Sequence, residues 1–207
     1  MKHLFITLCL LSVALFSSAQ GEKTALLITH YGSSDPDTRA LTLDVITREA
    51  KETFPQFEVR EAYISPIVRR RLEKQGVHKD SPVDALLKLR SEGYSRVLIQ
   101  RTTLIEGSEM TSVRRDAESV KPFFKEIKVG NPLLYTVEDC EKVIEILTQE
   151  QPGKKEDVIY VGHGNQLPST ATYAMLDYMM KAHGLKNFHV STIEGYPTLD
   201  ATLAQLK

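Results

Sequence analysis

Short apolar runs alternate with longer amphipathic segments along most of the chain. Apolar runs of about four to eight residues suit buried strands, whereas apolar positions that recur at roughly every third or fourth residue suit helices. The pattern predicts strands at residues 25–29, 57–64, 96–100, 127–129, 158–161 and 188–192, and helices at residues 37–53, 65–75, 82–92, 112–124, 136–149, 170–182 and 199–206. This alternation indicates parallel sheets with helices on both faces, so the predicted fold class is α/β.

The opening of this pattern occurs twice. His30 and Gly32 follow the first predicted strand, and Gly162-His163-Gly164 follows the fifth. A polar loop, a helix, a strand and a helix come after each, but only the first copy continues into a further strand, at residues 96–100. We therefore expect two similar lobes, at residues 20–135 and 136–207, of which the second is incomplete.

The first 19 residues differ from the rest. Leu4 to Phe16 is almost continuously apolar, and the small residues Ser17-Ser18-Ala19 follow. This order is typical of a secretory signal peptide, and the apolar run is shorter than the roughly 20 residues that span a bilayer. We expect cleavage after Ala19, a periplasmic or otherwise exported protein, and no membrane span after cleavage. Cys140 would then be the one remaining cysteine, which excludes an internal disulfide.

Charge and motifs narrow the classes of partner. The net charge is −1, so the composition does not favour nucleic acid or an anionic membrane surface. The chain carries no Gly-x-Gly-x-x-Gly after the first strand, no phosphate-binding Gly-Lys-Ser/Thr and no Gly-x-Ser-x-Gly. Dinucleotide binding, P-loop nucleotide chemistry and serine-hydrolase chemistry are therefore disfavoured.

Four polar side chains are predicted at the carboxyl ends of strands, where open α/β sheets bind ligands. His30, Glu109, His163 and Glu194 follow the first, third, fifth and sixth strands. Imidazole and carboxylate ligands together suit Co, Ni, Fe or Zn ions better than Ca or Mg ions. Structural interpretations stay open for each: either histidine can cap its loop by hydrogen bonding, and either glutamate can be a charge at a helix N-terminus.

Three groups of residues follow one another in a characteristic order. The first is Gly32-Ser33-Ser34 with Asp37-Thr38-Arg39, and the second is Phe54-Pro55 with Val59 to Tyr63. The third is Gly162-His163-Gly164 with Ala171 to Tyr178 and then Thr192 to Asp200. In this order, from Thr24 to Lys207, the chain resembles the anaerobic-type sirohydrochlorin cobaltochelatases, which are class II tetrapyrrole chelatases.

The resemblance implies a fold of two chelatase-like lobes and a set of site residues. It implies that His163 and Glu194 bind the metal and that His163 and Glu109 are catalytic. It further implies that the tetrapyrrole contacts a set of loop residues: His30, Gly32, Ser33 and Gly164. The sequence departs from the family in three features. The C-terminal Gly-Asp-His segment has no counterpart in it, Thr103 stands where many members carry a histidine, and His30 stands where many carry a serine.

The function implied by the resemblance is ATP-independent insertion of Co²⁺ into sirohydrochlorin in anaerobic cobalamin biosynthesis. The enzyme would be a metal chelatase of the lyase class, with Ni²⁺ or Fe²⁺ as other substrate metals and a small-molecule tetrapyrrole as partner; a homo-oligomer is compatible with it. The apolar N-terminal segment keeps a second function open. An exported relative could bind haem or another tetrapyrrole for haem or iron uptake and remove its iron.

Overall fold

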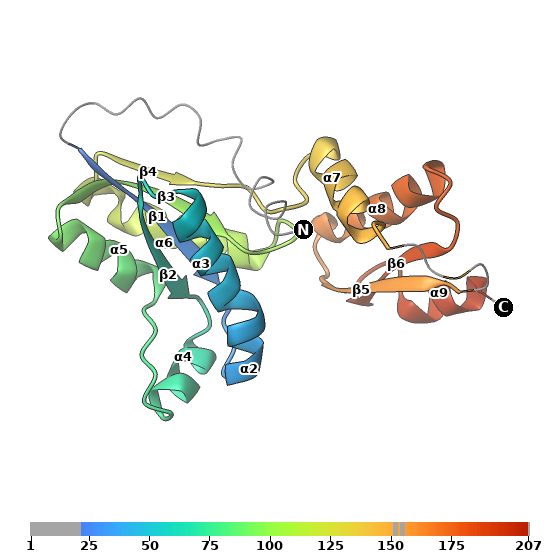
Figure 1. The fold of residues 1–207 in the computed structure, drawn as a ribbon, viewed down its shortest axis with the longest axis horizontal. Coiled ribbons are helices and arrows are strands. Elements are labelled where there is room, and N and C mark those ends of the chain that lie inside the picture. The colour runs from blue at the N-terminus through green and yellow to red at the C-terminus, as the bar shows by residue number, and fades with distance from the viewer. Residues whose placement is uncertain (1–21, 151–152, 154–155, 207) are drawn as a thin grey trace. The chain divides into compact units, whose positions relative to one another are not determined.

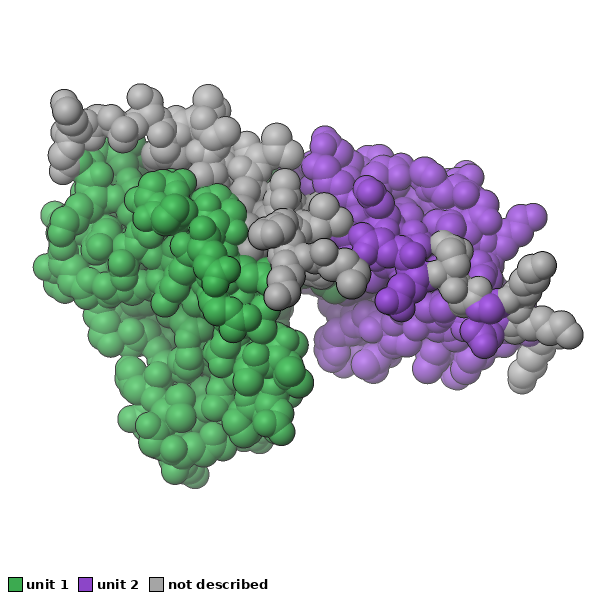
Figure 2. All heavy atoms as spheres, in the orientation of Figure 1, with its two compact units in different colours: residues 1–104, 108–133 green, residues 105–107, 134–207 purple. Residues whose placement is uncertain are grey.

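The computed structural model describes residues 22–150, 153 and 156–206. The predicted signal peptide lies outside these residues. The chain forms two compact units, which Figure 2 shows in different colours. Unit 1 comprises residues 1–104 and 108–133, and unit 2 comprises residues 105–107 and 134–207. The sequence pattern placed the division after residue 135, and it assigned the short segment 105–107 to the first lobe.

Unit 1 is built on a parallel sheet of four strands in the order β2-β1-β3-β4. The strands are β1 (Lys23–His30), β2 (Glu58–Tyr63), β3 (Tyr94–Arg101) and β4 (Glu126–Val129). Strand β1 lies between two neighbours, so its residues from Ala25 to His30 are all buried. Both edges of β1 are hydrogen-bonded, which removes its backbone from water.

Helices cover both faces of this sheet (Figure 1). The helical segments are α2 (Pro36–Thr38), the π-helix Arg39–Leu43, α3 (Asp44–Thr53), α4 (Pro66–Glu73), α5 (Pro82–Ser91), α6 (Ser108–Val120) and a 3-10 turn (Lys121–Phe123). Successive residues of β1 point to opposite faces. Leu27 therefore packs with residues of α5 and α6, whereas Leu26 packs with Ala50 of α3. Ser65 and Ser81 cap α4 and α5 by accepting backbone N–H groups, and each is followed by proline at the first helical position.

Unit 2 repeats the strand–helix order on a smaller scale. Its elements are α7 (Val137–Leu147), β5 (Val158–Gly164), a 3-10 turn (Pro168–Thr170), α8 (Ala171–Ala182), β6 (Phe188–Glu194) and α9 (Leu199–Gln205). Strands β5 and β6 pair in parallel. Among the described residues of this unit, these two strands make up the sheet. Cys140 of α7, Leu176 of α8 and Phe188 of β6 are buried in one core, so the helices cover one face of the pair.

The predicted α/β class with parallel sheets is confirmed. Three local differences concern the site. The predicted helix at 37–53 contains a π-helix at Arg39–Leu43. Helix α6 begins at Ser108, four residues before its predicted start at residue 112, so Glu109 lies in its first turn. Strands β1, β5 and β6 also run further than predicted, so His30, His163 and Glu194 lie on strand ends and not after them.

Candidate functional site

His30 lies at the carboxyl end of β1 and is fully buried. Its Nδ1 is 2.9 Å from Thr102 Oγ1, and its Nε2 is 3.2 Å from Thr47 Oγ1. The Thr47 hydroxyl donates its one proton to Glu61, at 3.2 Å, and can therefore only accept from His30. Nε2 must then carry the hydrogen, and Nδ1 accepts from Thr102. Both nitrogens are occupied, which favours the structural interpretation of this histidine.

Burial also controls the charge of His30. Removal from water lowers the pKa of its imidazole to about 4, and the nearby charges of Lys79 and Arg101 lower it further against the opposing effect of Glu61. The ring is therefore neutral at pH 7. Tyr63 contacts it edge-on, with the ring centroids 5.9 Å apart. The predicted contact between His30 and a tetrapyrrole stays a prediction.

Gly32 and Ser33 form the loop that follows β1, and both are half-buried. Ser33 Oγ accepts a hydrogen bond from the Asp35 backbone at 3.1 Å, and the Ser33 carbonyl accepts from Arg39 Nη1 at 3.3 Å. Asp35 in turn caps α2 by accepting from Thr38 N at 2.7 Å. The π-helix is thus attached to the loop through Arg39, and the loop has a defined conformation.

Glu109 lies in the first turn of α6, and its side chain is 41% exposed. Arg101 Nη2, at the end of β3, is 2.5 Å from Glu109 Oε2. Arg101 itself is 1% exposed, although its charge would favour water. The sequence pattern did not indicate Arg101 as a site residue. The available signal was a charged residue directly after the predicted third strand, residues 96–100.

His163 and Glu194 lie at the carboxyl ends of the two strands of unit 2. Both side chains are exposed. Gly164 pairs with Glu194 in the parallel register, so His163 lies one residue before the level of Glu194, on the adjacent strand. Neither side chain has a hydrogen bond or an ion pair with another residue that the structure describes, so both can accept a ligand.

Gly164 explains how the chain packs at this strand end. Its φ is +74°, a conformation that residues with a side chain rarely adopt. A Cβ built on it would be 1.6 Å from the carbonyl oxygen of Glu194. The backbone after β6 therefore passes directly against Gly164. Only glycine permits that approach, which joins the carboxyl ends of β5 and β6 closely at this point.

The predicted site residues are divided between the two units. His30, Gly32, Ser33 and Glu109 belong to unit 1, and His163, Gly164 and Glu194 belong to unit 2. Over residues 22–150, 153 and 156–206, no three histidine, cysteine or carboxylate residues form a ready metal-binding group. No helix in this part of the chain is long and apolar enough to cross a membrane.

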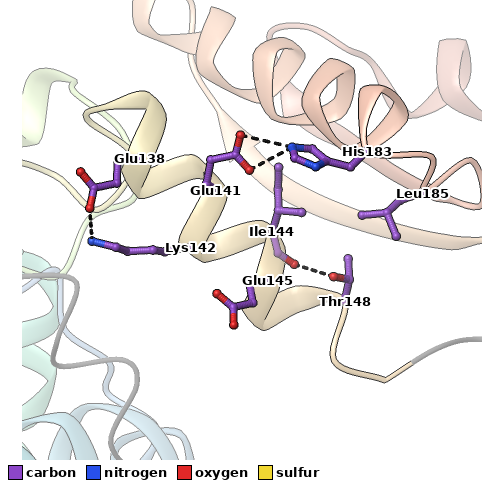
Figure 3. Close-up of a pocket in the computed structure, with 8 residues that line it drawn as sticks. All are labelled: Glu138, Glu141, Lys142, Ile144, Glu145, Thr148, His183 and Leu185. Atoms are coloured by element: carbon purple, nitrogen blue, oxygen red, sulfur yellow. Dashed lines mark hydrogen bonds and ion pairs between the residues drawn. The ribbon is translucent and has the colours of Figure 1, made fainter.

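A hollow of about 410 Å³ lies on unit 2, away from the predicted site residues. Figure 3 shows its lining, which comes from α7 and from His183 and Leu185 after α8. His183 Nε2 is 2.9 Å from Glu141 Oε2, and Lys142 Nζ is 2.8 Å from Glu138 Oε1. These polar groups pair with one another, so the hollow is not the predicted metal site.

Comparison with known proteins extends this picture. The chain is 31% identical over 188 residues to the sirohydrochlorin cobaltochelatase of Salmonella typhimurium, covering 89% of this chain and 71% of that protein. It is 32% identical over 190 residues to the sirohydrochlorin cobaltochelatase CbiKC of Nitratidesulfovibrio vulgaris, covering 89% and 67%. Its fold is similar to that of SirB from Bacillus subtilis with Fe³⁺, with a TM-score of 0.64 at 12% identity over 88% of this chain and 71% of that chain.

The paired α/β units and the relatives together define a metal chelatase, a lyase. The model of the cobalt chelatase family CbiK matches residues 24–207, and the chain belongs to this family. The predicted family is thereby confirmed.

Proposed function

We propose that this chain inserts Co²⁺ into sirohydrochlorin in anaerobic cobalamin biosynthesis, and that it does so without ATP. The observation that carries the proposal is that His163 and Glu194 are both exposed at the carboxyl ends of the adjacent strands β5 and β6, in a chain of the cobalt chelatase family. The relatives named above supply the substrate. The absence of a P-loop motif from the sequence agrees with a reaction that needs no nucleotide.

The chemistry assigns each unit a part. Chelation removes two protons from pyrrole nitrogens and transfers a partly desolvated cation to the macrocycle. We assign metal binding to His163 and Glu194, because imidazole and carboxylate suit Co²⁺, and also Ni²⁺ or Fe²⁺. Glu109 accepts one pyrrole proton in the proposal, and His163 accepts the other once the cation has passed from its imidazole to the macrocycle. Gly32, Ser33 and Gly164 contact the tetrapyrrole in the proposal, and His30 lies buried at the end of the strand that precedes the first of these loops.

The test is a cobalt-insertion assay with a matched pair of histidine variants. Purified protein is mixed with sirohydrochlorin and Co²⁺, and the absorbance change of the macrocycle is followed. His163→Ala should lower the rate by about 100-fold or more with an unchanged circular dichroism spectrum, since an exposed side chain contributes little to the core. His183→Ala, which removes an exposed histidine of the same unit, should keep the rate. Equal rates for wild type and His163→Ala would refute the site.

Export is a separate part of the proposal. The apolar segment from Leu4 to Phe16 supports it, and intact-mass analysis of protein from the native host should show a chain that begins at Gln20. The same segment supports the alternative of an exported haem- or tetrapyrrole-binding protein. Tight binding of haemin in a Soret titration, without any cobalt insertion, would favour that alternative.

A further inference from the structure

Arg101 is the most unusual charged residue of unit 1. It ends β3 opposite Thr29 of β1, so it lies at the carboxyl edge of the sheet. Its side chain is nearly inaccessible, yet its Nε and Nη1 atoms have no hydrogen-bond partner among the described residues. Its one ion pair there is with Glu109, through Nη2. A buried guanidinium with a single contact is a costly arrangement.

Stability does not explain this pair. The buried Arg101 guanidinium loses its hydration, and one contact with the part-exposed Glu109 recovers only part of that loss when the remaining donors stay unpaired. An apolar side chain of similar volume would serve the core as well or better. Features that cost stability tend to lie at functional sites. Arg101 also lies at the strand ends where α/β sheets bind ligands.

The contact constrains Glu109 in a specific way. Arg101 holds Oε2 at 2.5 Å, whereas Oε1 has no partner within the described chain. The side chain of Glu109 is 41% exposed and would otherwise sample several rotamers. Because Arg101 is enclosed by the core, its guanidinium is a fixed point. One oxygen of Glu109 is therefore immobilised, and the other is presented to solvent.

We propose that Arg101 is a positioning residue for the chelation reaction, which holds the Glu109 carboxylate by one oxygen and presents the other to the reacting tetrapyrrole. This inference rests on the function proposed above and on the part assigned there to Glu109. Arg101 itself does not touch the substrate. Because Arg101 acts through Glu109, its replacement should change kcat and not the affinity for Co²⁺.

Steady-state cobalt insertion by three variants of Arg101 tests this. Arg101→Gln should lower kcat by about 10- to 100-fold with little change in the KM for Co²⁺, the range found when a supporting contact of a site residue is lost. Arg101→Lys keeps a cation that can hold one oxygen and should restore part of the loss. Arg101→Met removes the charge at similar volume and should fold and melt at least as well as wild type, with a kcat as low as that of Arg101→Gln.

A double variant and a control variant distinguish a positioning role of Arg101 from a purely structural one. Glu109→Gln combined with Arg101→Gln should be no slower than Glu109→Gln alone, because Arg101 acts only through that carboxylate. Arg96→Gln, on the same strand and ion-paired with Glu22 and Glu126, should keep the wild-type kcat. If the wild type is active and both Arg101→Gln and Arg101→Met turn over as fast as the wild type, only the role of Arg101 is overturned. A wild type that inserts no cobalt would overturn the proposed function as well.

Discussion

The two units each end a parallel strand with a histidine, and the two histidines have opposite environments. In unit 1, β1 lies between β2 and β3, and His30 is fully buried with both ring nitrogens bonded. In unit 2, β5 pairs with β6 alone among the described strands, and His163 is exposed without a side-chain partner. The same residue type at the same topological position is therefore buried and hydrogen-bonded in one unit and exposed in the other.

The strands themselves show why. Residues Ala25 to His30 are buried without interruption. In β5, Val158 to Tyr160 are half-buried, Val161 and His163 are exposed, and only Gly164 is buried. A strand with two neighbours and helices on both faces has no path to water, and a strand with one neighbour keeps one edge open. Solvent access is a property of the surrounding elements and not of the motif.

The largest expected effect tests how closely unit 2 packs at its strand end. Gly164→Ala should cost at least about 4 kcal/mol in the free energy of unfolding, because the new methyl group would occupy the place of the Glu194 carbonyl. Gly184→Ala is the matched control. Gly184 also has a positive φ, +79°, but its Cβ would meet no atom within 4 Å. It should cost only about 1–2 kcal/mol. Similar losses in urea unfolding followed by circular dichroism would show that the backbone does not pass against Gly164.

The next effect compares the two strands directly. Leu27→Ala, in the middle of β1, should cost about 2–5 kcal/mol, since it leaves a cavity in a core with no exposed surface. Val161→Ala, in the middle of β5, should cost less than about 1 kcal/mol because Val161 is 48% exposed. The same urea measurement checks both. Equal losses would mean that β5 is as enclosed as β1, against the comparison drawn above.

The smallest effect concerns pH and the buried histidine. The pKa of His30 is about 4 in the folded chain and near 6.5 in the unfolded chain, so the unfolded state binds more protons between these values. The part of the free energy of unfolding that depends on a neutral His30 is fully present above pH 6.5 and is lost as the pH falls towards 4. This loss amounts to about 3 kcal/mol. His30→Gln should remove this part of the pH dependence. The measurement is the urea midpoint of the wild type and of His30→Gln between pH 7 and pH 4. If the two midpoints fall equally, His30 does not cause this pH dependence.

The sequence predicted the elements of this protein well, and it predicted the environments of the site residues poorly. Apolar periodicity placed every strand within about three residues of its observed ends, since side-chain alternation is a local property. The start of α6 was missed by four residues, because Ser108 to Thr111 carry little apolar signal. That error placed Glu109 in a loop and concealed its pairing with Arg101.

The sequence by itself determined the α/β class, the repeated strand-and-histidine pattern and the family, because periodicity and motifs depend on neighbours in the chain. Only the tertiary structure decided that His30 is enclosed, that His163 is open, that Arg101 holds Glu109 and that the backbone at Glu194 passes against Gly164. Burial and pairing are set by residues far apart in sequence, such as His30 with Thr102 and Gly164 with Glu194. Whether a polar side chain is structural or reactive depends on which of those long-range contacts it receives, since each contact removes a bonding position that a ligand could use.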